Sequence, residues 1–244
     1  MIIALLASFL NISTANAIIG GVPVSADEEI AHTTVMLIGQ MATGGYSCSG
    51  TILNEQWILT AAHCVIGAQQ MVVVFARNAP ESTWKAMLTS GKLIRHVTSV
   101  NHNMDYPTSD AGQMTPHNDI GLVQFTGGLV KGYRPVTLLN PASLPKFVNA
   151  KQNTVIAGFG IRTAGGTDSG ALYETTIPID QANAKEIDVG SPEDVACHGD
   201  SGGPAFVKVG GKFYQWGVAS RSDCKSFSIY TPLKSNFYGH MATP

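Results

Sequence analysis

Apolar and polar residues alternate in short runs along most of the chain. Each run has a period of two, the spacing of a strand with one buried face, and the runs recur roughly every ten to fifteen residues. Clusters of Gly, Pro, Asn or Ser separate most of them. The pattern predicts an all-β protein, a sandwich or a barrel, with clear strands at residues 34–38, 57–60, 71–75, 120–125, 154–157 and 214–219.

Helical periodicity is confined to a short segment near the C-terminus, residues 233–240. Residues 129–153 are rich in Gly, Pro, Asn and Lys and are a candidate linker between two β-units. Residues 101–118 form a long loop before the strand that opens at Asp119. A loop of that length in a compact domain is usually functional or mobile.

The first 17 residues carry no charged side chain. Their apolar run, residues 2–10, has the length of a signal-peptide hydrophobic region and is too short to span a bilayer. Ala15, Asn16 and Ala17 give the small-x-small pattern of a cleavage site, although no Lys or Arg precedes the apolar run. We expect residues 1–17 to be a signal peptide, rather than a buried strand. The mature chain, residues 18–244, is then secreted or periplasmic, with no membrane span.

Composition narrows the function classes. Lys and Arg number 15 against 17 Asp and Glu, a net charge of −2, which argues against a nucleic-acid-binding protein. The hydrophobic share of 44% excludes an acidic disordered chain. The 26 glycines favour many turns and short strands.

Export places the cysteines in an oxidising compartment, where they pair. Three pairings are possible, and the sequence alone does not choose between them. A metal site is the competing interpretation, because His63 and His198 each adjoin a cysteine. Adjacent ligands point in different directions and there is no C-x₂-C spacing, so we expect no metal and no other cofactor. The four cysteines are Cys48, Cys64, Cys197 and Cys224.

Residues 199–203, Gly-Asp-Ser-Gly-Gly, fit the G-x-S-x-G elbow of α/β-hydrolases. That fold needs the serine first, then an acid, then a histidine. After Ser201 the chain offers only Asp223 and His240, with almost no sheet between them. A serine esterase of another fold is therefore disfavoured.

The opposite order fits well: His63 follows a predicted strand, Asp119 opens a later one, and Ser201 comes last. With these motifs the chain resembles the chymotrypsin-like (trypsin-fold) serine peptidases. The resemblance implies two six-stranded antiparallel β-barrels packed with the active site between them, at about residues 18–130 and 131–244, and a short C-terminal helix. The matching segments are residues 18–21, 57–64, 118–122, 157–160, 199–204 and 230–231.

The resemblance also implies the roles of the catalytic residues. A serine hydroxyl is a poor nucleophile at neutral pH and needs an adjacent base. His63 is expected to take the proton of Ser201, and Asp119 to fix the imidazole tautomer. The backbone N–H groups of Gly199 and Ser201 are expected to bind the oxyanion. Taken singly, each residue has a structural alternative: His63 as a core histidine, Asp119 as a strand cap, and Ser201 as part of a turn.

Two disulfides follow from the resemblance, Cys48–Cys64 and Cys197–Cys224. So does an activation ion pair between the α-ammonium group of Ile18 and Asp200. Because Ala17 ends the signal sequence, signal-peptidase cleavage itself is expected to create that terminus. The alternative is that Ile18 merely begins the first strand.

The substrate pocket is expected to have Val195 and Ala196 at its floor, His198 at its rim, and Ser220, Ser222 and Ser228 along its walls. Trypsin-type enzymes have Asp at the floor, so Val195 favours small or medium uncharged side chains. Arg221 and Ser222 depart from the usual family residues.

The expected function is that of a secreted serine endopeptidase acting through an acyl-enzyme. We expect protein or peptide substrates, protein inhibitors, a monomer, and no nucleic-acid partner. The alternative is a catalytically silent homologue that acts as a binding protein. Such proteins typically lose a triad residue, and this chain keeps all three.

Overall fold

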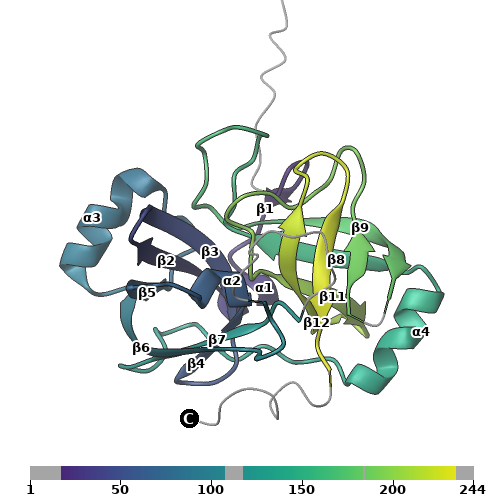
Figure 1. Ribbon diagram of the computed structural model, residues 1–244, viewed down its shortest axis with the longest axis horizontal. Helices are drawn as coiled ribbons and strands as arrows, with labels where there is room; N and C mark the ends of the chain where they lie inside the picture. Colours follow the sequence, from purple (N-terminus) through teal and green to yellow (C-terminus); the bar gives the residue numbers. More distant parts are fainter. Residues whose placement is uncertain (1–17, 108–117, 184, 235–244) are drawn as a thin grey trace, which may run out of the picture.

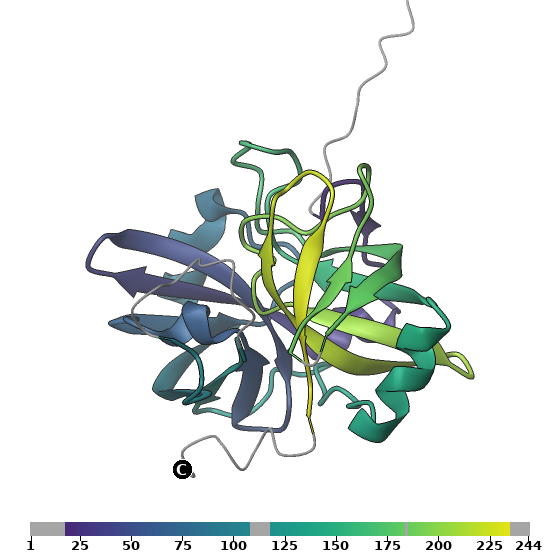
Figure 2. The same ribbon diagram turned by 45° about the vertical axis from the view of Figure 1, so that its right-hand side comes forward.

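The computed structural model describes residues 18–107, 118–183 and 185–234. Within these ranges the chain forms two antiparallel β-barrels that lie side by side (Figure 1). Turning the molecule by 45° leaves the same two bodies in view (Figure 2). The prediction of two six-stranded barrels is therefore confirmed.

The first barrel closes in the strand order β2-β3-β4-β7-β6-β5, with β5 paired back to β2. The pairing of β6 with β7 shifts register between Val97 and Ser99, and such a bulge helps a six-stranded sheet to bend and close. The strands are β2 (Thr34–Met41), β3 (Gly44–Ile52), β4 (Trp57–Thr60), β5 (Gln70–Val74), β6 (Ile94–His102) and β7 (Gly121–Phe125).

The second barrel runs β9-β10-β13-β12-β11-β8, and the pairing of β8 with β9 closes it. The two-residue β1 (Val22–Pro23) adds to β9 from outside, so the N-terminal segment crosses to the second barrel. The strands are β8 (Asn153–Gly158), β9 (Tyr173–Ala182), β10 (Ile187–Val189), β11 (Pro204–Val209), β12 (Lys212–Ser222) and β13 (Ser228–Pro232).

Each of the six predicted strands falls on an observed one. Residues 75 and 120 lie one position outside β5 and β7, and β2 and β12 extend up to three residues beyond the predicted ends. The helices are short: α1 (Glu29–Thr33), α2 (Ala62–Val65), α3 (Glu81–Ser90), α4 (Leu144–Asn149) and the 3₁₀ turn η1 (Pro141–Ser143). The sequence pattern did not predict α3, which buries none of its residues and lies outside the first barrel (Figure 1). The predicted C-terminal helix, residues 233–240, lies outside the described ranges from residue 235 on.

Three apolar clusters hold the fold together. One fills each barrel, and the third joins them, with Met36 and Val74 of the first barrel packed with Phe159 and Phe206 of the second. Burying a large apolar side chain contributes roughly 1.5–3 kcal/mol, so this third cluster fixes the barrels against each other. No helix in the described ranges has the length and hydropathy needed to cross a membrane.

Candidate active site

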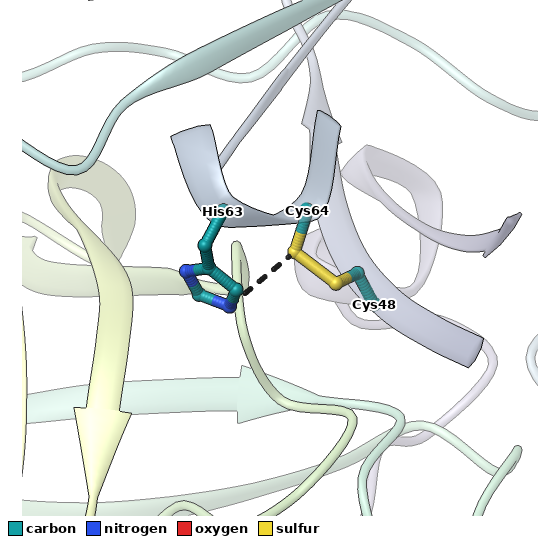
Figure 3. Close-up of side chains that lie close together, drawn as sticks. All are labelled: Cys48, His63 and Cys64. Atoms are coloured by element: carbon teal, nitrogen blue, oxygen red, sulfur yellow. Dashed lines mark hydrogen bonds between the residues drawn. A yellow bond between two sulfur atoms is a disulfide. The ribbon is translucent and has the colours of Figure 1, made fainter. Parts of the chain in front are cut away.

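His63 lies on the one-turn helix α2, directly after β4. The next residue, Cys64, is joined by a disulfide to Cys48 of β3, which anchors this turn to the barrel wall. Figure 3 shows the imidazole folded back toward that bridge, with Nε2 3.7 Å from Cys64 Sγ. The carbonyl oxygen of Ser201 lies 3.7 Å from the same sulfur, so the nucleophile loop adjoins the histidine.

Asp119 is 2% exposed and opens the segment that leads into β7. Its Oδ2 lies 2.8 Å from His63 Nδ1, and its Oδ1 accepts the His63 backbone N–H at 3.1 Å. Ser220 Oγ donates a third hydrogen bond to Oδ2 at 2.7 Å. The carboxylate is thus fixed by three contacts before any substrate arrives.

The contact between His63 and Asp119 shifts the pKa of both side chains. Burial alone raises the pKa of Asp119, but the adjacent His63 and the donated hydrogen bonds outweigh it, and the net pKa is lowered. Burial alone lowers the pKa of His63, but the Asp119 carboxylate outweighs it, and the net pKa is raised. Asp119 is therefore ionised at neutral pH, and the imidazole is a stronger base than a free one.

Ser201 lies in the turn between Cys197 and β11, packed tightly against the first barrel. Its carbonyl accepts the backbone N–H of Ser49 at 2.8 Å, and Ser49 Oγ donates to the carbonyl of Gly199 at 2.9 Å. Gly202 has φ +81°, and a Cβ there would lie 2.0 Å from Thr60 Oγ1. Only glycine permits this close approach of the loop to the barrel.

Two backbone N–H groups of this turn, those of Gly199 and Ser201, are available to bind an anion. Across the described residues, neither the N–H of Gly199 nor that of Ser201 donates to a protein acceptor. Between the described side chains of Ser201 and His63 there is likewise no hydrogen bond, a looseness that is common before substrate binds. Ser201 and these two N–H groups thus belong to a turn whose Ser201 carbonyl oxygen adjoins Cys64, the residue next to His63.

Asp200 is fully buried beneath this turn. Its Oδ1 accepts the N–H of Gly160 and its Oδ2 that of Cys197, both at 2.8 Å. Burial outweighs these bonds and raises the pKa of Asp200 to about 7. No cationic group in the described ranges forms an ion pair with it.

Ile18 is also fully buried, in the apolar cluster of the second barrel. The next residue, Ile19, exchanges two backbone hydrogen bonds with Val195, at 2.9 and 3.1 Å. The N-terminal segment is therefore docked into the second barrel. Its partner there, Val195, precedes Ser201 in the chain by only a few residues.

The structure joins Cys48 to Cys64 and Cys197 to Cys224. All four sulfurs are therefore taken, and neither Cys-His pair is left with a thiolate for a metal ion.

The expected pocket residues lie together but differ in exposure. Val195 and Ser228 are fully buried, and Ser228 Oγ accepts the N–H of Ala196 at 2.8 Å. Ser222 Oγ donates to the carbonyl of Phe227, and His198 is exposed. The Ser220 hydroxyl is engaged with Asp119, which the sequence alone did not indicate.

Sequence reasoning also missed Ser49 and the pairing of Arg221. Ser49 is 150 positions from Gly199 and has no motif around it. Arg221 forms a two-pronged ion pair with Glu186 of the β9–β10 connection, at 2.6 and 2.8 Å. A buried arginine on a strand signals an acidic partner, but only the register of β10 and β12 on β13 identifies it.

Comparison with known proteins adds the family. The sequence model of the Trypsin family matches residues 18–238. Trypsin-1 from Astacus astacus is 28% identical over 71% of this chain and 76% of its own length. Serine protease SSP1 from Scolopendra subspinipes is 28% identical over 86% of this chain and 74% of its own length. Serine protease 56 from Mus musculus is 30% identical over 64% of this chain, which spans 26% of that longer protein.

Proposed function

The chain belongs to the trypsin family of serine endopeptidases, and we propose that it hydrolyses peptide bonds with Ser201 as nucleophile, His63 as base and Asp119 as orienting acid. The observation that carries this assignment is the buried 2.8 Å contact between His63 Nδ1 and Asp119 Oδ2. It leaves Nε2 on the other side of the ring, 3.7 Å from Cys64 Sγ, the sulfur that also lies 3.7 Å from the Ser201 carbonyl oxygen. A base held in one tautomer can accept a proton at Nε2 and return it to the leaving amine.

The acylation step follows from these positions. Ser201 Oγ attacks the substrate carbonyl while its proton moves to His63 Nε2, and the carbonyl oxygen becomes an oxyanion. The free N–H groups of Gly199 and Ser201 support the proposal that both donate to that oxygen. The protonated imidazole then gives its proton to the leaving amine, and water hydrolyses the resulting acyl-enzyme by the same route.

Labelling with a fluorophosphonate probe tests the nucleophile. We expect one label per chain on the processed protein, none on Ser201→Ala, and full labelling of the control Ser99→Ala on the far strand β6. If processed wild-type protein with an intact fold takes no label, the chain is instead a catalytically silent homologue that acts as a binding protein.

We further propose that residues 1–17 are a signal peptide and that residues 18–244 form the exported peptidase domain. Removal of the signal peptide then frees the Ile18 amine to pair with Asp200. The buried Ile18 and the cation-free Asp200 carboxylate support this. So does the backbone of Ile18, whose φ of 52° strains a β-branched residue as long as a peptide bond precedes it. A free amine has no preceding carbonyl, so cleavage relieves that strain.

N-terminal sequencing of the exported protein tests the activation proposal. A single start at Ile18 in active protein supports it, and a different start with full activity overturns it. The catalytic assignment is unaffected by either result, because labelling of Ser201 measures it separately.

For the substrate we propose small or medium uncharged side chains at the residue before the cleaved bond. The proposal rests on Val195, Ala196 and Ser228, which are buried and carry no charge, and it takes the more exposed Ser222 and His198 as the edge of the pocket. A fluorogenic library varied at that residue tests this, with a preference for Arg or Lys as the contrary result. Ser228→Gly removes a buried hydroxymethyl group, so we expect it to shift the preference toward larger side chains. We also propose that the enzyme works as a monomer open to protein inhibitors.

A further inference from the structure

A cavity of about 710 Å³ lies away from the triad, where three segments meet. Its walls come from the N-terminal segment around Val24, from the stretch between β5 and β6 that includes α3, and from the β8–β9 connection. A volume between roughly 300 and 1,000 Å³ is typical of sites for small ligands. In Figure 1, α3 lies beside the first barrel and β1 on the second. The cavity is lined by residues of both, Met87 of α3 and Pro23 of β1.

The charges that line this cavity leave one cation unbalanced. Arg162 Nε lies 3.0 Å from the Asp168 carboxylate, so these two groups neutralise each other. Arg77 forms no ion pair with any described residue, and one of its N–H groups donates to the carbonyl of Val24 at 3.1 Å. Its guanidinium therefore keeps further donors for one negative charge.

The uncharged part of the lining combines apolar side chains with the polar Asn78, Ser169 and Tyr173. Met87 of α3 and Leu93 before β6 face the cavity together with Leu172, and Leu93 is 36% exposed. A single spare cation beside such walls matches a monoanion with an apolar group. A phosphate dianion fits less well, because it exceeds the one available charge and lies near Asp168.

The cavity is also linked to the docked N-terminus. Arg77, Val24 and Leu172 are tied in a ring: Leu172 N–H donates to the Arg77 carbonyl, and Val24 N–H to the Leu172 carbonyl. Val24 follows Ile19 by five residues, and the β8–β9 connection begins next to Gly160, which donates to Asp200. A ligand on Arg77 therefore braces both segments that surround the activation pair.

We propose that this cavity is an effector site for a carboxylate that carries an apolar group, and that its occupancy holds the N-terminal segment docked. The binding half stands on the cavity alone, and the regulatory half rests on the proposed pairing of Ile18 with Asp200. Two kinds of ligand offer a carboxylate with an apolar group: a fatty acid and the free C-terminus of a hydrophobic peptide.

Calorimetric titration of the exported protein carrying Ser201→Ala tests binding without cleavage of a peptide probe. The probes are octanoate against octanol, and acetyl-Ala-Leu-Leu as the free acid against its amide. We expect saturable one-to-one binding of at least one acid, at least tenfold tighter than its neutral analogue. The acid that binds identifies the source. Absence of saturable binding by both acids, or equal binding of the neutral analogues, overturns the proposal.

Variants place the site. Arg77→Met is expected to weaken binding at least tenfold, whereas Arg134→Met, at an exposed arginine outside the cavity, leaves it unchanged. Met87→Trp fills the cavity from α3 without touching Arg77, so it is expected to abolish binding even if Arg77→Met impairs folding. Unchanged binding in both Arg77→Met and Met87→Trp overturns the site.

Hydrogen exchange tests the regulatory half. Saturating ligand is expected to slow exchange of the Ile19 amide, which donates to Val195, by at least threefold. Tight binding with unchanged exchange at Ile19 overturns the link to the N-terminus. Because the protein carries Ser201→Ala, neither measurement depends on catalysis.

Discussion

At the scale of the residue, the orientation and the pKa of His63 depend on the contacts of one carboxylate, that of Asp119. It accepts from the ring and backbone of His63 and from Ser220, and each bond removes some of the burial cost of the charge. The same charge raises the pKa of His63 against the effect of burial. One carboxylate therefore sets both the orientation and the basicity of the proposed base.

Asp119→Asn removes this charge while keeping the shape of the side chain. We expect kcat/KM to fall by about 10⁴-fold, because an amide favours the wrong imidazole tautomer. Activity requires neutral His63, so it rises as pH increases through the pKa of that group. Loss of the carboxylate lowers this pKa, and the acid limb of the pH–rate profile moves to lower pH.

The matched control is Asp105→Asn, which changes an acid of the neighbouring loop that does not contact His63. Its profile is expected to coincide with wild type. An acid limb that stays in place in Asp119→Asn shows that a group other than His63 controls it.

At the scale of elements, the Arg221–Glu186 pair ties the end of β12 to the start of β10. The side chains are 19% and 3% exposed, so both charges are largely out of water. Ser220, which holds Asp119, is the residue before Arg221, and the pair thus fixes the strand end that orients the acid. Glu186 also contributes to raising the pKa of Asp188, after burial.

Arg221→Met is expected to lower the free energy of unfolding by about 3 kcal/mol, because it leaves Glu186 buried without its cation. The double variant Arg221→Met/Glu186→Gln is expected to recover most of that loss, since no unpaired charge remains. Urea unfolding measures both. A double variant that is less stable than Arg221→Met contradicts the electrostatic explanation.

An exposed ion pair serves as the control for this unfolding experiment. Lys151 and Asp180 lie 3.8 Å apart with side chains 70% and 59% exposed. Lys151→Met is expected to change the free energy of unfolding by less than about 1 kcal/mol, because water and salt screen exposed charges.

At the scale of the whole molecule, Asp200 lies buried where the serine turn meets the β8–β9 connection, and its carboxylate accepts the N–H groups of Cys197 and Gly160. Its pKa of about 7 applies to the chain with the bond before Ile18 intact. The unfolded value is 3.8, so between these values the folded chain binds more protons than the unfolded one. The stability of the uncleaved chain therefore falls as pH rises from about 4 to about 7.

We expect this loss to be on the order of 4 kcal/mol for the uncleaved chain in a Ser201→Ala background. In the chain that starts at Ile18, the proposed pairing of the ammonium group with Asp200 is expected to remove this loss. Chemical unfolding from pH 4 to pH 8 compares the two forms, and His63 contributes equally to both. Equal pH dependence of the two forms contradicts the pairing of Ile18 with Asp200.

Much of the fold could be predicted from alternation alone. Residues 34–38 were predicted as a strand, and the structure covers both of its faces: Val35 and Leu37 lie in the cluster of the first barrel, and Met36 in the cluster that joins the barrels. α3 could not be predicted, since it buries no residue and so carries no amphipathic pattern. For the site, the motifs around His63, Asp119 and Ser201 pointed to their chemistry, whereas Ser49 and Glu186 had no local signal.

The sequence by itself determined the strand periodicity, the family and the order of its catalytic motifs, because these are properties of neighbouring residues. Only the tertiary structure decided which distant groups meet. It placed Ser220 on Asp119, Ser49 under the serine turn, and Asp200 beneath Gly160. It also left Arg77 as the one unpaired cation among the described residues that line the α3 cavity. Such contacts depend on strand register and barrel closure, which bring together residues 40 to 150 positions apart.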